Sequence, residues 1–597
     1  MEPYKGCTII DIHPGACLWS QKLHKALKPK LHVLMEPEEL YVDTFIKPLV
    51  KQSHSKYRHT TLSGANQHNY LGNYQKLIGE GLLPLAPESS RDDRVALQPD
   101  ENILVTGNLA RQYYDGHKGR ANTVSFVDMV LQHMTWAALS NDLFHRQGRV
   151  RMLWWLPERH KEGIIPQRAS RITGHSAGLF MGANISEVVG VNRGADSISE
   201  MEYKRNSADA AEKHKSMNIS SAHKVQEKMA SAGMKVPKAR KHLYPDLAIT
   251  KKTTNPPDDL ISPVKIEYDT VPQLEKAIND QTARIEAVMQ TLQGSTRLKS
   301  GSAAHKYFSH IAATLQYPQC RPITASIRNF LPRRKNAEGK QHRVRIDDAP
   351  TIAQNRVMII MDSILRIINL EAHYKHLEEH NAFRDAEQRE SFKSQIISLD
   401  KAFRAEIEEN HRVISRHVEQ AIMEQLAFFA DPEVIPFERR AYEPLSASLE
   451  DFWPKHPLTL LDLTPTTRDL SVPGIANPRE AIKTAQEIIK YLYLRRGQPL
   501  PGVLDMIAPN ASKDLLPLVG TISDPRRGGR LNLDAMRVRM LSTEMVEDLV
   551  KAWFEWPFRP EAWELALAMG GAPSAGAAGD ESMDEAVGDE GPDAGEE

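Results

Sequence analysis

The chain has 597 residues, too many for a single compact core, and its 41% hydrophobic and 26% charged residues are typical of globular proteins. No stretch approaches the ~20 apolar residues that span a bilayer, which argues against a transmembrane protein. The three cysteines make neither a disulfide framework nor a CxxC metal motif, so a reducing compartment is the simplest interpretation.

The net charge of −1 conceals an asymmetry along the chain. Residues 570–597 contain nine Asp and Glu and no Lys or Arg, which predicts a disordered acidic tail. The rest of the chain has 76 basic and 68 acidic residues, a net charge of about +8. That charge is compatible with a nucleic-acid partner.

The first predicted elements form a strand–turn–helix–strand unit. Residues 7–12 are an apolar run containing Asp11 and predict a buried strand. A Pro-Gly turn follows, and then a stretch with helical spacing that ends at Pro29. Residues 31–37 predict a second strand with Glu36 near its tip. This order is one βαβ unit.

Strands and helices continue to alternate up to about residue 170. Residues 102–109 and 149–157 predict strands, and residues 126–144 predict a helix between them. Alternation of this kind favours an α/β fold with an open, mainly parallel sheet over residues 1–170.

The composition then changes. Residues 171–260 are polar, with twelve Lys and Arg over 201–252, and predict a basic flexible insertion. Residues 261–455 predict a helical region. The helices expected there are 271–293, 356–370 and 407–426. Residues 456–569 predict a C-terminal helical domain, in which 458–465 are a candidate strand returning to the sheet.

The turn after the first strand has the outline of a cofactor site. A strand that feeds a glycine-containing turn brings backbone close to a ligand and points a helix N-terminus at it. The spacing from Asp11 through Gly15 to Glu36 suits S-adenosylmethionine, because a carboxylate at Glu36 can hold ribose hydroxyls. The alternative, which the residues leave open, is that all three only shape the turn and cap the helix.

Several segments resemble the rRNA adenine N6-dimethyltransferase family. They are "ILVTGNLAR", "GRVRMLWWLPER", "APNASKDLL" and "DPRRGGRLNLDAMRVRMLSTEMVEDLVKAWFEWPFRP". The last of these, together with "DIHPGACLWSQKLH", is most similar to the fungal mitochondrial transcription factor B branch, the specificity factors of mitochondrial RNA polymerase. The similarity covers roughly residues 1–170 and 455–565.

The resemblance implies a Rossmann-like methyltransferase fold with a helical C-terminal domain, and it assigns roles to individual residues. Asp11, Gly15, Glu36 and Asn108 would contact S-adenosylmethionine. Asn108 would also hold the amino group of a target adenine.

The sequence departs from the family pattern at five positions. His13 and Cys17 stand where the family has glycine, and Gly64 stands where it has an acid. Ala110 replaces a proline and Arg111 replaces the aromatic residue that stacks on the base. Stacking is worth ~1–3 kcal/mol per base. We therefore expect weakened cofactor binding, no metal, and only a vestigial catalytic residue in Asn108.

Six arginines are candidates for contact with nucleic acid, and those on the strand and in the loop also have an ordinary structural alternative. They are Arg111, Arg149, Arg151, Arg526, Arg527 and Arg530. Arg149 and Arg151 alternate with Trp154 and Trp155 in the manner of single-strand binders, but core packing would also explain the tryptophans. The last three arginines lie in a Gly-containing loop and suit either phosphate contact or simple exposure.

Three histidines at helical spacing, His373, His376 and His380, are interpreted as a solvated helix face rather than a metal site.

Together these features predict a mitochondrial transcription initiation factor that acts with the single-subunit RNA polymerase and binds melted promoter DNA. The alternative is an active rRNA adenine N6-dimethyltransferase of the mitochondrial small ribosomal subunit, and a third interpretation is a structural ribosomal protein. The expected location is the mitochondrial matrix, although no secretory signal or Arg/Ser-rich transit peptide precedes the first strand. The sequence leaves open whether the N-terminus is complete.

Overall fold

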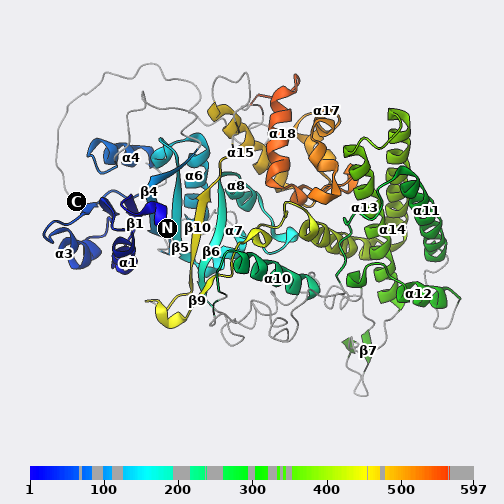
Figure 1. Ribbon diagram of the computed structural model, residues 1–597, viewed down its shortest axis with the longest axis horizontal. Helices are drawn as coiled ribbons and strands as arrows, with labels where there is room; N and C mark the ends of the chain where they lie inside the picture. The colour runs from blue at the N-terminus through cyan, green and yellow to red at the C-terminus, as the bar shows by residue number, and fades with distance from the viewer. Residues whose placement is uncertain are drawn as a thin grey trace, which may run out of the picture.

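A computed structural model gives an α/β architecture around an eight-stranded sheet (Figure 1). It describes residues 1–65, 70–83, 98–110, 126–191, 215–235, 237, 260–293, 303–320, 333–335, 341–343, 352–453, 455–468, 470, 478–561 and 564. The sheet order is β3-β2-β1-β4-β5-β10-β6-β9. The strands are β1 (Thr8–Ile12), β2 (Leu31–Met35), β3 (Tyr57–Thr60), β4 (Pro99–Asn108), β5 (Arg149–Pro157), β6 (Ala183–Val191), β9 (Leu445–Ala447) and β10 (Leu458–Pro465).

Most of the sheet is parallel. Strands β3, β2, β1, β4 and β5 are parallel to one another, and β9 is parallel to β6. The exception is β10, which is antiparallel to both β5 and β6 and lies between them. The predicted mainly parallel sheet and the predicted return of residues 458–465 to it are both confirmed.

Both faces of the sheet are covered, which explains the unbroken apolar run of β1. Ile9 faces α1 (Leu18–Leu27) and packs with Leu23 and Leu27. Ile10 and Ile12 face the other way, into the large cluster beneath α6 (Phe126–Ser140) and α8 (Gly174–Gly182). A strand buried on both sides needs apolar residues at every position rather than alternating ones.

The predicted flexible insertion over 171–260 is wrong at its beginning. Residues 174–182 form α8, and residues 183–191 form β6 within the sheet. Four β6 residues are only half-buried, so the strand carries Ser186 and Glu187 and lacks the apolar pattern that would identify it. Within the rest of that range, the structure describes one helix, α10 (Lys215–Ser231).

The three helices expected in the middle of the chain are confirmed. Helix α11 (Val271–Gln293) has the predicted bounds, whereas α13 (Ile352–Glu379) and α14 (Ala386–Phe429) are longer than predicted. A fourth helix, α12 (Ala303–Ala313), was not predicted. Figure 1 shows them at the end of the molecule away from β1. A short hairpin of β7 (Arg333–Lys335) and β8 (Gln341–Arg343) lies within the same region.

The C-terminal helices pack on the sheet region. They are α15 (Pro478–Leu494), α16 (Leu500–Ile507), α17 (Ala511–Leu515) and α18 (Thr543–Glu555). Helix α15 contacts α6 and α8, and α18 contacts α15. One continuous apolar cluster joins these helices to the sheet and to α13 and α14. Trp553 and Trp556 are buried in it, so they belong to the core.

The remaining short helices are α2 (Glu39–Tyr41), α3 (Lys47–Val50), α4 (Tyr70–Gly79) and α7 (Lys161–Ile164). Among the described residues, no helix combines the length and the apolar character needed to cross a membrane. The predicted contact residue Arg111, the acidic tail and most of the basic segment lie outside the described residues.

Candidate functional site

The residues predicted to hold a cofactor meet at one edge of the sheet, where β1, β2 and β4 end. Asp11 pairs with Thr106 of β4 in the sheet, and Asn108 is the last residue of that strand. Glu36 directly follows β2. Because the carboxyl ends of parallel strands share one edge, the predicted grouping of Asp11, Gly15, Glu36 and Asn108 is what the fold produces.

The two acids are bound within the chain. Glu36 is 1% exposed; one of its carboxylate oxygens accepts the Gly15 N–H at 3.1 Å and the other accepts the Glu38 N–H at 3.1 Å. Asp11 is also 1% exposed, and its Oδ2 lies 3.4 Å from Nε2 of His32. Glu36 therefore ties the turn to the end of β2, and Asp11 lies beside a buried histidine.

The turn itself carries side chains in left-handed conformations. His13 has φ +55° and Cys17 has φ +58°, a region that favours glycine. His13 Nε2 lies 3.2 Å from Oγ of Ser63, and the Cys17 thiol is fully buried. Burial, together with the Asp11 carboxylate, raises the pKa of Cys17 to about 12. The thiol is thus protonated at neutral pH and is a poor nucleophile.

Two glycines at the same edge have no room for a side chain. A Cβ on Gly64 would lie 2.8 Å from Ile12 and 3.1 Å from Met35. A Cβ on Gly107 would lie 2.5 Å from the Trp154 ring. The acid that the family pattern places at Gly64 would therefore force these neighbours apart.

Asn108 makes a local contact at the strand end. Its Oδ1 accepts the N–H of Ala110 at 2.9 Å. This hydrogen bond is the ordinary way in which an Asn shapes a turn. It occupies one lone pair of the amide oxygen that would otherwise hold an adenine amino group.

Taken together, the residues present do not fit S-adenosylmethionine in this conformation. Glu36, the carboxylate predicted to hold ribose, is buried and accepts two backbone N–H groups, and the turn carries the side chains of His13 and Cys17 at positive φ, where the resemblance predicts glycine. No metal is indicated either: in the described ranges, no three His, Cys, Asp or Glu side chains are grouped to bind one.

The two arginines of β5, Arg149 and Arg151, are engaged by partners within the chain. Arg149 is 1% exposed and donates to the carbonyl oxygen of Thr466, so it cannot reach a phosphate. Arg151 forms a two-pronged ion pair with Asp462 of β10, with Nε 2.8 Å from Oδ1. Trp154 is fully buried, which favours the core-packing alternative for that residue. β5 can carry these polar groups because β10 and the residue directly after it, Thr466, supply their partners.

The arginines of the 524–530 loop are also mostly occupied. Arg530 is 3% exposed, and both carboxylate oxygens of Glu371 accept from it at 2.9 Å. Arg526 lies 2.6 Å from Glu379 and also pairs with Asp524. Only Arg527 keeps a half-exposed side chain, at 47%. The loop is held against α13 rather than offered to a ligand.

One of the three histidines at the end of α13 and directly after it also differs from the prediction. His373 is fully buried rather than solvated. Its Nδ1–H donates to the Asn369 carbonyl at 2.7 Å, and its Nε2 accepts the Glu267 N–H at 2.7 Å. Burial lowers the pKa of His373, which keeps the ring neutral. His376 is half-buried and His380 is exposed.

Sequence reasoning missed a stacked group beneath α1. The rings of His24 and Tyr57 stack with centroids 4.1 Å apart, and Nδ1 of His24 lies 3.2 Å from Nδ1 of His32. Burial and then the charge of His32 lower the pKa of His24 to about 4. The polar His32 within an apolar strand was the available signal, because a buried histidine needs a partner.

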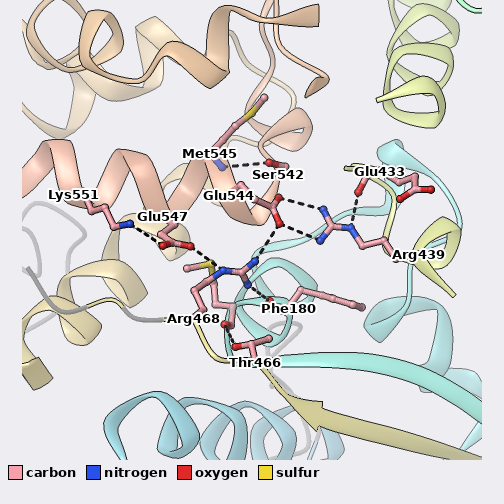
Figure 2. Close-up of polar contacts among 11 residues, drawn as sticks. Phe180, Glu433, Arg439, Thr466, Arg468, Ser542, Glu544, Met545, Glu547 and Lys551 are labelled. Atoms are coloured by element: carbon pink, nitrogen blue, oxygen red, sulfur yellow. Dashed lines mark hydrogen bonds and ion pairs between the residues drawn. The ribbon is translucent and has the colours of Figure 1, made fainter. Parts of the chain in front are cut away.

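A second polar site lies at the opposite edge, where β10 ends (Figure 2). Arg468 donates to Glu547 at 2.9 Å, to Glu544 at 3.1 Å and to the Phe180 carbonyl at 3.1 Å. Arg439 pairs with the other oxygen of Glu544 at 3.3 Å. Burial acts to raise the pKa of Glu544, but Arg439 and Arg468 outweigh it and hold that pKa below its usual range.

This cluster borders a hollow of about 720 Å³. The hollow is lined by Asn184, Pro465, Thr466, Thr467, Arg468, Glu547 and Lys551. The guanidinium of Arg468 faces two carboxylates, so the cluster is a clamp that fastens α18 to the sheet (Figure 2). Because Glu544 and Glu547 compensate the charge of Arg468, this guanidinium is not available to bind an anionic ligand.

Comparison with known proteins identifies no relative: no family model matches this chain, and no curated protein shows significant sequence similarity to it.

Proposed function

We propose that this protein is a mitochondrial transcription initiation factor built on a degenerate rRNA adenine methyltransferase scaffold. In this proposal it acts in the matrix with the single-subunit RNA polymerase, gives promoter selectivity and binds melted DNA. The former RNA-binding cleft holds single-stranded promoter DNA, and Arg111 contacts phosphate or a base edge where an aromatic ring once stacked.

The strand order supports the scaffold. The order β3-β2-β1-β4-β5 is that of Rossmann-like sheets. Strand β10 lies antiparallel between β5 and β6 and is the returning strand predicted at residues 458–465. In this proposal β10 and the C-terminal helices are the counterparts of the last strand and the helical domain of the scaffold.

The observation that carries the proposal is the state of the cofactor turn. Glu36 is 1% exposed and bonded to two backbone N–H groups, and His13 and Cys17 occupy left-handed positions meant for glycine. A protein selected for methyl transfer would keep this turn open. Because this turn is not open, the fold is better suited to a binding role than to methyl transfer.

Promoter-dependent run-off transcription tests the proposal. We expect the protein to stimulate the mitochondrial polymerase strongly on a duplex promoter and weakly on the same promoter opened beforehand by mismatches. The difference follows if the factor acts by holding melted strands. Absence of stimulation on the duplex template would contradict the proposal.

The grouping of Gly15, Glu36 and Asn108 at one edge is the specific observation that favours the alternative, an active dimethyltransferase. Calorimetry with S-adenosylmethionine separates the two functions. We expect no measurable heat of binding. Micromolar binding that Glu36→Gln abolishes, together with methyl transfer to a small-subunit rRNA hairpin, would establish the enzyme instead.

A further inference from the structure

Seven basic residues lie along the two stretches of chain that lead into β2 and β3, and these strands begin at the edge of the sheet opposite the cofactor turn. All seven are exposed, and we call them the basic edge. They are Lys22, Lys25, Lys28, Lys30, Lys51, Lys56 and Arg58.

The sheet topology brings these residues together from two stretches of sequence. Helix α1 ends at this edge, with Lys28 at its C-cap, and β2 starts there. The Lys30 N–H donates to the Cys7 carbonyl just before β1, and the His32 N–H donates to the Lys56 carbonyl just before β3. Lys30 and Lys56 therefore precede adjacent strands. Figure 1 shows α1 and α3 at the end of the molecule away from α11–α14.

The charges of the basic edge are not balanced by acids. Among the described residues, no carboxylate lies within 4.0 Å of any of the seven cationic groups, whereas the nearby Lys5 and Lys47 each pair with a carboxylate. The helix dipole of α1 accounts for lysines in its last turn, because cations are stabilised at a helix C-terminus. It does not account for Lys30, Lys51 or Lys56, which lie outside that helix.

We propose that the basic edge binds the phosphate backbone of nucleic acid without reading its sequence. Clustered lysines on a narrow surface neutralise successive phosphates, and lysines alone give positioning rather than base recognition. The choice of nucleic acid among polyanions rests on the function proposed above. The surface itself is separate from the cleft in that proposal, because it lies at the opposite edge of the sheet.

An anionic membrane is the other polyanion that such a surface could meet. Membrane-binding patches combine lysines with apolar side chains that enter the lipid. The exposed apolar residues in this part of the chain are Met1, Leu18, Leu40 and Phe45. Leu18 and Leu40 lie at the start of α1 and in α2, toward the cofactor edge, and Met1 precedes β1. Nucleic acid is chosen because it follows from the function proposed above, and vesicle binding in the test below is the membrane outcome.

The test compares two triple variants of the full chain that change the net charge equally. One is Lys28→Glu, Lys30→Glu and Lys56→Glu. The control is Lys276→Glu, Lys483→Glu and Lys513→Glu, three exposed lysines on α11, α15 and α17. Binding of a labelled duplex and a labelled single strand of unrelated sequence is followed by fluorescence anisotropy across a range of salt concentrations.

We expect the basic-edge variant to weaken duplex binding at least tenfold more than the control, and to flatten the slope of log K against log salt by about 0.9 per lost phosphate contact. Equal weakening by both variants would show that only net charge matters and would overturn the proposal. Unchanged DNA binding with lost binding to vesicles of anionic phospholipid would overturn it in favour of a membrane.

Two further measurements keep the result interpretable. Matched Lys→Gln triples, with thermal midpoints for each, replace the Glu variants if these fail to fold. Run-off transcription with the same variants separates the two proposals. If the protein stimulates the polymerase but the basic-edge variant binds DNA as well as the control variant does, only this inference is contradicted. If DNA binding depends on the basic edge but the protein does not stimulate the polymerase, only the proposed function is contradicted.

Discussion

The 524–530 loop and the basic edge carry the same sign of charge in opposite settings. In the loop, Arg530 is 3% exposed and bonded to Glu371 of α13, and Arg526 pairs with Asp524 and Glu379. At the basic edge, seven exposed cations lie without a nearby acid among the described residues. A run of basic residues therefore stays exposed or becomes part of an internal ion-pair network according to what the fold places opposite it.

The largest effect should come from breaking the buried ion pairs of Arg530 with Glu371 and Asp400. Arg530→Met leaves the fully buried carboxylates of Glu371 and Asp400 without this guanidinium, which we expect to cost about 3–5 kcal/mol of unfolding free energy. Denaturant and thermal unfolding measure it. Arg527→Met, at a half-exposed side chain of the same loop, should stay within about 0.5 kcal/mol of the unmodified protein. Equal losses in both variants would show that the loop, rather than the buried ion pair, sets stability.

A smaller effect concerns pH and the packing of α1, the helix that carries part of the basic edge. The folded-state pKa of His24 is lowered to about 4, so the unfolded chain takes up its proton first. The stability that depends on neutral His24 is complete above about pH 6.5 and is lost as the pH falls toward 4. His24→Phe keeps a ring against Tyr57 and should reduce the fall in melting temperature between pH 7 and pH 5. An unchanged pH dependence would argue against this role.

The smallest expected effect lies in the acidic tail. Removal of residues 570–597 deletes nine carboxylates and leaves a net charge of about +8. We expect the affinity for duplex DNA to rise about twofold to fivefold at low salt, and the gain to vanish at high salt because surface charges are then screened. Anisotropy titrations with and without the tail measure this. A gain that persists at high salt would point to direct contact rather than long-range repulsion.

Elements with strong patterns were predictable from the sequence. The apolar run of β1 and the helical spacing of α11 are sufficient to predict these two elements. The segment "LTLLDLTP" likewise predicts β10, although its partner strands lie far away in the chain. Strand β6 was missed because half-exposed positions admit polar residues, and a polar strand resembles a loop.

The candidate site was predictable in its grouping but not in its contacts. The spacing of Gly15 and Glu36 predicts that they lie together, but not that the Gly15 N–H donates to the Glu36 carboxylate. Arg530 could not be placed, because Glu371 is 159 residues away and on another element. The basic edge was overlooked for the same reason, since only the pairing of β2 with β3 brings Lys30 near Lys56.

The position of β10 also has a consequence during synthesis. Strands β5 and β6 are translated early, but the strand that joins them begins only at Leu458. At about 5–20 residues per second, the ribosome needs roughly 15–50 s to travel from β6 to β10, and both strands remain without their shared neighbour throughout. Unpaired strand edges invite aggregation. Nascent chains of this protein should therefore need a chaperone during that interval, and chains terminated before Leu458 should be insoluble.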